Sequence, residues 1–129
     1  MKFLKTEIEN QIIDINATDT LSRTALMKAV INGNIECVKY HIKLGCNVNH
    51  VDILGDTVLS IAVEEGNVEI VKLLVENHAD ITYKNFQRKN IIQLVEELIR
   101  NSTDYNLNKD YQQILKLLKN SKQYKNLLR

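Results

Sequence analysis

The stretch TALMKAVINGNIECVKYHIKLGCNVN, residues 24–49, is echoed by TVLSIAVEEGNVEIVKLLVENHADIT, residues 57–82, at a spacing of 33. Both segments begin with threonine and carry an alanine five residues on, then a Gly-Asn pair and a Val-Lys pair at matching positions. So many coincidences in one register indicate an internal repeat. A period of this length is typical of stacked helical units that bury their apolar faces against one another.

Each copy has the local signals of two helices joined by a tight turn. A threonine begins the first helix, where its hydroxyl can accept a free backbone amide. A glycine ends that helix in a left-handed conformation, and the asparagine after it begins the second helix. The second helices carry apolar residues three and four positions apart, so one stripe is buried. The signal residues are Thr24, Gly33 and Asn34 in the first copy and Thr57, Gly66 and Asn67 in the second.

This pattern resembles the ankyrin repeat family, whose unit is a turn followed by two antiparallel helices. The resemblance implies an all-α fold, an ankyrin-type α-solenoid of stacked helix-turn-helix repeats with turns that project as fingers. The family's usual Thr-Pro-Leu-His opening is replaced by Thr-Ala-Leu-Met at 24–27 and by Thr-Val-Leu-Ser at 57–60. Because proline at a first helical position is pre-organised and this chain has none, we expect softer helix starts.

Weaker copies of the period extend the array at both ends into one domain. Asp52 has counterparts one period away on either side, Asp19 and Asn85, but the second-helix pattern at 114–118 matches 70–74 at a spacing of 44. We expect these 11 extra residues to lengthen the inter-helix loop, over residues 101–110, because terminal repeats of such arrays are atypical. The expected units are a partial N-terminal cap over 1–18, repeats over 19–51 and 52–84, a variant repeat over 85–121 and a basic tail over 122–129.

Composition predicts a single soluble domain in a reducing compartment. With 129 residues and 44% hydrophobic side chains, the chain can bury a sizeable core. It has no apolar run long enough to span a membrane and no signal-peptide pattern in its first fifteen residues. Its two cysteines fall at apolar positions of the repeat. We therefore expect a cytoplasmic monomer, with end-to-end stacking of copies as the alternative.

One group of residues has the chemistry of a metal site. Cys37, His41, Cys46 and His50 are ligand types of structural zinc. Three of them, however, align with Ile, Leu and Ala of the second copy, and their spacing matches no zinc-finger pattern. The sequence also has no phosphate-binding loop and no nucleophile with a plausible base. We therefore predict no metal, no cofactor and no enzymatic activity.

His41 occupies a position that leucine fills in the second copy. A buried imidazole needs a hydrogen-bond partner, and adding a proton to it would destabilise the array. The sequence therefore gives the hypothesis that His41 is a weak point of the fold.

Large apolar residues recur at the positions of the fingers. In ankyrin arrays the fingers and first helices line a concave face that usually binds another protein, and the resemblance implies the same here. Turn tips are normally polar, so a row of exposed apolar groups indicates a contact surface. The alternative is that these side chains fold back over the neighbouring turn. The predicted protein-binding residues are Leu21, Arg23, Ile31, Asn32, Ile53, Leu54, Asp56, Glu64, Glu65, Phe86, Gln87 and Lys89.

Charge is uneven although the total is only +1. Residues 1–80 carry a net charge of −5, and residues 81–129 carry +6. The basic half ends in a predicted helix whose cations could bind nucleic acid or anionic lipid. The alternative is a solvated capping helix with its cations at the negative end of the helix dipole. We favour the capping helix, because clustered arginines and interleaved aromatic residues are missing. The cations concerned are Lys116, Lys119, Lys122, Lys125 and Arg129.

Together these features predict a non-catalytic protein–protein interaction module, an adaptor or an inhibitor. The composition, rich in asparagine, isoleucine and lysine, resembles that of small ankyrin proteins from intracellular bacteria or large viruses. That resemblance implies an effector with host proteins as targets in the host cytosol. The alternative function is binding of nucleic acid or an anionic membrane surface through the C-terminal helix.

Overall fold

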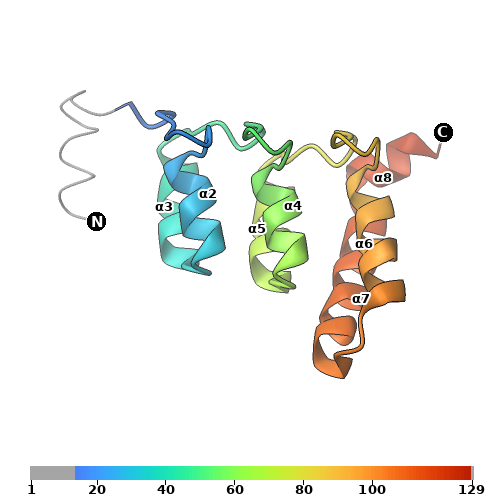
Figure 1. The fold of residues 1–129 in the computed structure, drawn as a ribbon. Helices are drawn as coiled ribbons and strands as arrows, with labels where there is room; N and C mark the ends of the chain where they lie inside the picture. Colours follow the sequence, from blue (N-terminus) through green and yellow to red (C-terminus); the bar gives the residue numbers. More distant parts are fainter. Residues whose placement is uncertain (1–13, 129) are drawn as a thin grey trace.

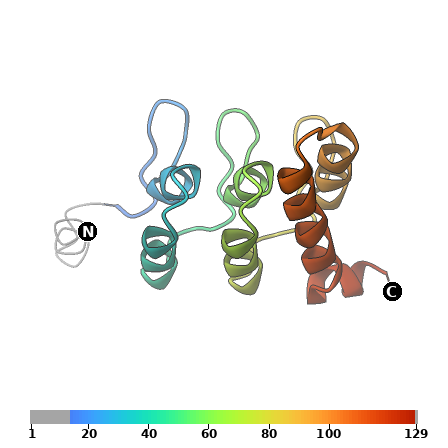
Figure 2. The same ribbon diagram turned by 90° about the horizontal axis from the view of Figure 1, so that it is seen from below.

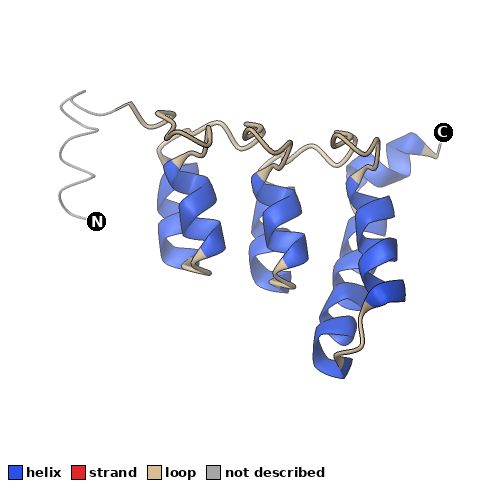
Figure 3. Cartoon of the chain, viewed as in Figure 1, coloured by secondary structure: helices blue, strands red, loops and turns tan. Residues whose placement is uncertain are grey.

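A computed structural model describes residues 14–128, and all the regular structure in this part of the chain is helical (Figure 3). Three helix pairs stand side by side below a row of loops (Figure 1). The all-α solenoid expected from the sequence is therefore confirmed, whereas the cap expected over residues 1–18 lies mostly outside the described residues. The helices are α2 (Ala25–Ile31), α3 (Ile35–Lys43), α4 (Val58–Glu64), α5 (Val68–Glu76), α6 (Ile91–Asn101), α7 (Tyr105–Lys119) and α8 (Lys122–Leu127).

The helices of the first two pairs begin and end where the local signals predict. Thr24 Oγ1 accepts the Met27 amide at 3.3 Å, and Thr57 Oγ1 accepts the Ser60 amide at 3.2 Å. Asn34 and Asn67 cap α3 and α5 in the same way. Because Gly33 and Gly66 have φ angles of +67° and +70°, they end α2 and α4 in the conformation that glycine adopts most easily.

Each finger begins with the same turn, in which a side-chain oxygen accepts backbone amides. Asp19, Asp52 and Asn85 each use one side-chain oxygen to accept two backbone amides, from the residues two and four positions further on. All six distances fall between 2.9 and 3.1 Å. Such Asx turns add to the two backbone hydrogen bonds that each finger makes between its first residue and the residues three and four positions further on. The three fingers therefore share one conformation.

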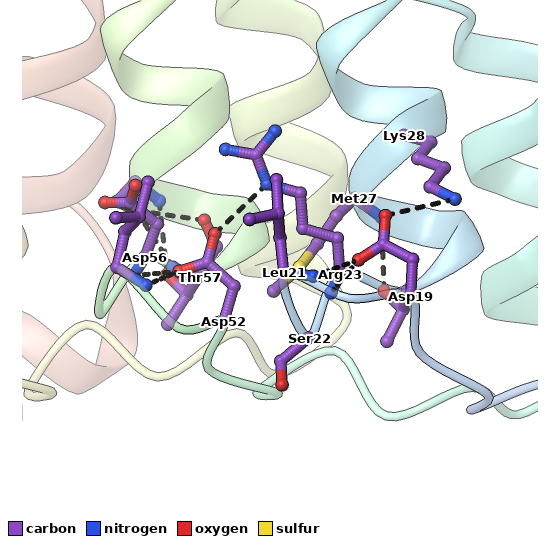
Figure 4. A network of polar contacts seen from close by, with 12 residues as sticks. Asp19, Leu21, Ser22, Arg23, Met27, Lys28, Asp52, Asp56 and Thr57 are labelled. Atoms are coloured by element: carbon purple, nitrogen blue, oxygen red, sulfur yellow. Dashed lines mark hydrogen bonds and ion pairs between the residues drawn. The ribbon is translucent and has the colours of Figure 1, made fainter.

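Contacts between neighbouring fingers hold them parallel. The Ile53 amide donates to the Leu21 carbonyl at 3.0 Å, and Arg23 Nε lies 3.3 Å from Asp52 Oδ2 (Figure 4). The carbonyls at the bends of the first two fingers also lie against side chains from the following loops. His50 Nε2 lies 2.7 Å from the Ser22 carbonyl oxygen, and the Tyr83 hydroxyl donates to the Gly55 carbonyl at 3.1 Å.

The predicted lengthened loop over residues 101–110 is wrong. The helix α6 runs to Asn101 and α7 begins at Tyr105, so the extra residues lengthen the two helices. Asp104 caps α7 by accepting the Leu107 amide at 3.0 Å, and Asn108 Nδ2 donates to the Ile99 carbonyl at 2.8 Å. These contacts, together with packing of α7 on α5 and α6, override the weak helix propensity of this polar segment.

The prediction that one C-terminal helix carries the lysines is also wrong. The helix α7 ends at Lys119 with Asn120 as its C-cap, and a separate helix, α8, begins after its N-cap Ser121. The break lets Gln123 reach back to the loop after α5, where its Oε1 accepts the Ile81 amide at 3.0 Å and its Nε2 donates to the Ala79 carbonyl at 2.8 Å. Earlier in the array, an asparagine in one loop accepts a backbone amide of the next loop. Asn16 Oδ1 accepts the Asn47 amide and Asn49 Oδ1 accepts the Asp80 amide, both at 2.8 Å. The helix α8 therefore caps the backbone of this loop.

We predict that Asp52→Ala destabilises the fold by about 2–3 kcal/mol, because it leaves two finger amides and the Arg23 guanidinium without their acceptor. Asp52→Asn is the matched control, since Asn85 performs the same double acceptance in the third finger. It should lose only about 1 kcal/mol, the contribution of the ion pair. Urea unfolding of the three proteins tests this, and equal losses in both variants would contradict it.

We predict that His41→Leu raises the free energy of unfolding by about 1 kcal/mol. His41 is buried, with Nδ1 2.7 Å from the Cys37 carbonyl oxygen, and its Nε2 has no hydrogen-bond partner among the described residues. Leucine removes this unsatisfied nitrogen and fills the space as Leu74 does in the second repeat. His41→Ala, which opens a cavity, should instead lower stability, and both changes are measured by chemical denaturation. A stability loss in the leucine variant would refute the weak-point hypothesis.

Candidate protein-binding surface

The fingertips carry four large apolar side chains that are exposed. The exposed fractions are 45% for Leu21, 58% for Ile53, 60% for Leu54 and 72% for Phe86. The fingers project from the same side of the row of helices (Figure 2). Each tip residue follows the Asx residue that fixes its turn, so these side chains extend from loops of defined shape. The structure therefore brings together four of the residues predicted to bind protein.

Phe86 also folds back on its neighbour, which was the alternative for the apolar tips. A Cβ atom built on Gly55 would lie 3.0 Å from atoms of the Phe86 ring, so one face of that ring covers the bend of the second finger. The ring nevertheless remains mostly exposed. Phe86 thus helps to align two fingers and still presents apolar surface.

The charged residues predicted at the finger bases are engaged within the molecule. Arg23 pairs with Asp52, and the Asp56 carboxylate accepts a hydrogen bond from Ser60 Oγ at 3.4 Å (Figure 4). Lys89 forms an ion pair with Glu97 of α6. These side chains fasten the fingers to each other and to the first helices. Gln87, by contrast, is exposed at the tip of the third finger.

The helical part of the predicted surface is acidic in its middle. Ile31 and Asn32 are exposed at the end of α2, and Glu64 and Glu65 take the equivalent positions at the end of α4. Although the Glu64 side chain is exposed, partial loss of hydration at the end of α4, followed by the charges of Asp56 and Glu65, raises its pKa. Burial and the charge of Asp52 likewise raise the pKa of Asp56. The middle repeat therefore concentrates negative charge that repels itself.

Sequence reasoning missed the residues that join the fingers. His50 and Tyr83 lie one repeat period apart and reach equivalent carbonyls, but their different chemistry concealed the match. The period of Asp19, Asp52 and Asn85 was visible in the sequence and could have predicted the Asx turns. The signal was that each of these three side chains has an oxygen that can accept backbone hydrogen bonds.

The residues considered for zinc point to other partners. His41 Nδ1 faces the Cys37 carbonyl and His50 Nε2 faces the Ser22 carbonyl. Burial raises the pKa of the Cys46 thiol, which favours its protonated form over the thiolate that binds metal. Within residues 14–128, no group of three or more histidine, cysteine or acidic side chains could hold a metal ion. In the same part of the chain, no helix is long and apolar enough to cross a membrane.

Comparison with known proteins identifies one family. Residues 2–85 match the family model for ankyrin repeats, in three copies. A search of curated proteins gave no match. The matched segment contains α2 to α5 and the start of the third finger, whereas α6, α7 and α8 lie beyond it.

We predict that Glu64→Gln stabilises the protein near neutral pH. The raised pKa means that the folded state holds the Glu64 proton more tightly than the unfolded state does, so the ionised carboxylate lowers stability above that pKa. Because Glu64 is exposed to screening, the gain should be about 0.3–0.5 kcal/mol.

The gain should disappear as the pH falls below about 4, where both states are protonated. Urea unfolding of wild type and variant at both pH values tests this, with the exposed Glu96→Gln on α6 as the matched control. A gain of the same size at both pH values would show that charge is not the cause.

Proposed function

This chain belongs to the ankyrin repeat family, and we propose that it binds a protein partner through its apolar fingertips. Members of the family are generally protein–protein interaction modules and are typically non-catalytic. The observation that carries the proposal for this chain is the exposure of Leu21, Ile53, Leu54 and Phe86 on fingers that are themselves well ordered by hydrogen bonds.

The order of the fingers supports their use in binding. Binding must offset the conformational entropy lost when loops become ordered, and a loop that is already ordered loses little. Covering apolar surface contributes about 25 cal/mol for each Å² removed from water. A partner with a complementary apolar patch would therefore gain affinity from side chains that the solvent-exposed fingers already hold in place.

We propose further that the module acts by covering its partner's surface, as an adaptor or an inhibitor. Its composition supports an origin in an intracellular bacterium or a large virus, where a chain of this kind would act on host proteins in the host cytosol. Binding of nucleic acid or an anionic membrane through the C-terminal helix is the alternative. The contacts of Gln123 with the loop after α5 favour a structural role for that helix.

We predict that the double change Ile53→Asp and Phe86→Asp abolishes partner capture, since buried charges at central contact positions cost several kcal/mol. The matched control is Leu127→Asp with Leu128→Asp, which charges two equally exposed apolar residues at the C-terminal end. Each protein is immobilised and exposed to cytosolic extract at moderate salt, and bound proteins are quantified by mass spectrometry.

Proteins retained by wild type and by the C-terminal variant, but lost from the fingertip variant, are the expected result. Circular dichroism and urea unfolding verify that both variants remain folded. Equal retention by all three proteins, or recovery of nucleic acid alone, would disprove binding through the fingertips.

A further inference from the structure

The third finger differs from the second in its charge. Residues 85–89 include two cations, Arg88 and Lys89, and no carboxylate, whereas residues 52–56 include two carboxylates and no cation. Lys89 is paired with Glu97 of α6. Arg88 is exposed and forms no ion pair within the described part of the chain. The third finger therefore presents a cation that is not neutralised inside the protein.

Arg88 also occupies a backbone position that favours glycine. It lies at the bend of its finger with a φ angle of +62°, and the equivalent residues of the first two fingers are Ser22, at +57°, and Gly55, at +84°. A side chain in this left-handed region costs free energy that glycine avoids. Strained positions of this kind cluster at functional sites, where the side chain contributes to binding. The backbone strain at Arg88 is therefore consistent with a role for its side chain in binding.

The bend that carries Arg88 is uncovered. Side chains from the following loops, His50 and Tyr83, lie against the bends of the first two fingers. After the third finger the chain continues into α6, α7 and α8, so within the described residues no further finger stacks on it (Figure 2). Arg88 thus stands at the open end of the row of fingers, two positions after Phe86, which is 72% exposed.

We propose that Arg88 pairs with a carboxylate of the protein partner, next to the apolar residue that contacts Phe86. The partner segment then carries an aspartate or glutamate within a few positions of a large apolar side chain. A guanidinium suits this contact, because it can donate two parallel hydrogen bonds to one carboxylate.

The other fingertips favour a protein over a nucleic acid as the source of this negative charge. Single-stranded nucleic acid binds where successive bases stack on successive aromatic side chains. The row of fingers has one exposed aromatic residue, Phe86, and its other exposed apolar residues, Leu21, Ile53 and Leu54, are aliphatic. Aliphatic side chains are suited to the apolar part of a protein surface.

This inference rests on the proposed function and adds charge selectivity to it. Apolar contacts at the tips give affinity for many apolar surfaces, whereas an exposed arginine selects those with an acidic group beside them. Arg88 is therefore a residue of specificity and not of stability. Replacing it with glycine should relieve the backbone strain and weaken binding at the same time.

Arg88→Gly and Ser22→Gly form a matched pair of variants. Each places glycine at the left-handed bend position, so each should raise the urea concentration at the midpoint of unfolding. Only the first of them removes the cation. Arg88→Lys keeps a positive charge and a side chain at the bend, so it should bind more tightly than Arg88→Gly and should not gain stability.

The probe is a phage-displayed library of random peptides, selected on the immobilised wild-type chain at moderate salt. Recovered peptides should share an aspartate or glutamate near a large apolar residue. The most enriched peptide, made synthetically, should bind Arg88→Gly about tenfold more weakly than wild type, and Ser22→Gly as wild type does. Its analogue with the acid changed to the amide should bind wild type and Arg88→Gly equally.

Recovery of no peptide, peptides without acidic residues, or equal binding of the acidic peptide by wild type and Arg88→Gly would overturn the inference. A lower unfolding midpoint in Arg88→Gly would also overturn it, because it would show a structural role for the arginine. Oligouridylate is titrated in the same assay, and tighter binding of it than of the peptide would assign the third finger to nucleic acid instead.

The fingertip variant Ile53→Asp, Phe86→Asp separates this inference from the proposed function. Capture from extract that is lost in the fingertip variant and unchanged in Arg88→Gly would remove only the role of Arg88. Capture that persists in the fingertip variant would remove the proposed function, and this inference with it.

Discussion

One side-chain oxygen at the start of each finger is the constraint on which the binding surface depends. In Asp19, Asp52 and Asn85 this oxygen accepts two amides of its own loop, and so fixes the finger without any strand or helix. The turn then delivers the chain to the N-cap of the next first helix. Because the oxygen recurs once in every repeat, neighbouring fingers have the same shape and can stack. The exposed apolar side chains at their tips therefore occupy equivalent positions from finger to finger.

Stacking also decides which charges remain available to a partner. Asp52 uses one oxygen for its own turn and the other for Arg23 of the preceding finger. Asn85 has no negative charge, and Lys89, the counterpart of Arg23 two repeats on, turns to Glu97 instead. The charges at the bases of the first and third fingers are thus paired within the protein, whereas Asp56, at the base of the second, forms no ion pair among the described residues. Glu64 and Glu65 form no ion pair among the described residues, so negative charge persists at the end of α4 that lies away from the fingertips.

The last helix pair makes contacts that the regular repeats lack. Its extra residues carry α6 and α7 past the middle repeat and place Leu107 and Tyr111 against the end of α4. The break before α8 then lets Gln123 satisfy the backbone at residues 79–81. One end of this pair therefore packs on the end of α4, and the helix that follows the other end binds the backbone of the loop after α5.

The sequence by itself determined the repeat, the helix starts, the glycine turns and the exposed apolar tips, because each depends on residues within a few positions or on the repeat period. Only the tertiary structure decided that residues 105–110 are helical, that the C-terminal segment divides at Asn120, and that Arg23 and Lys89 are held internally. The contacts responsible join residues far apart, 47 positions for Tyr111 with Glu64 and 42 for Gln123 with Ile81. Local propensity cannot report such contacts, since their free energy appears only when distant segments pack together.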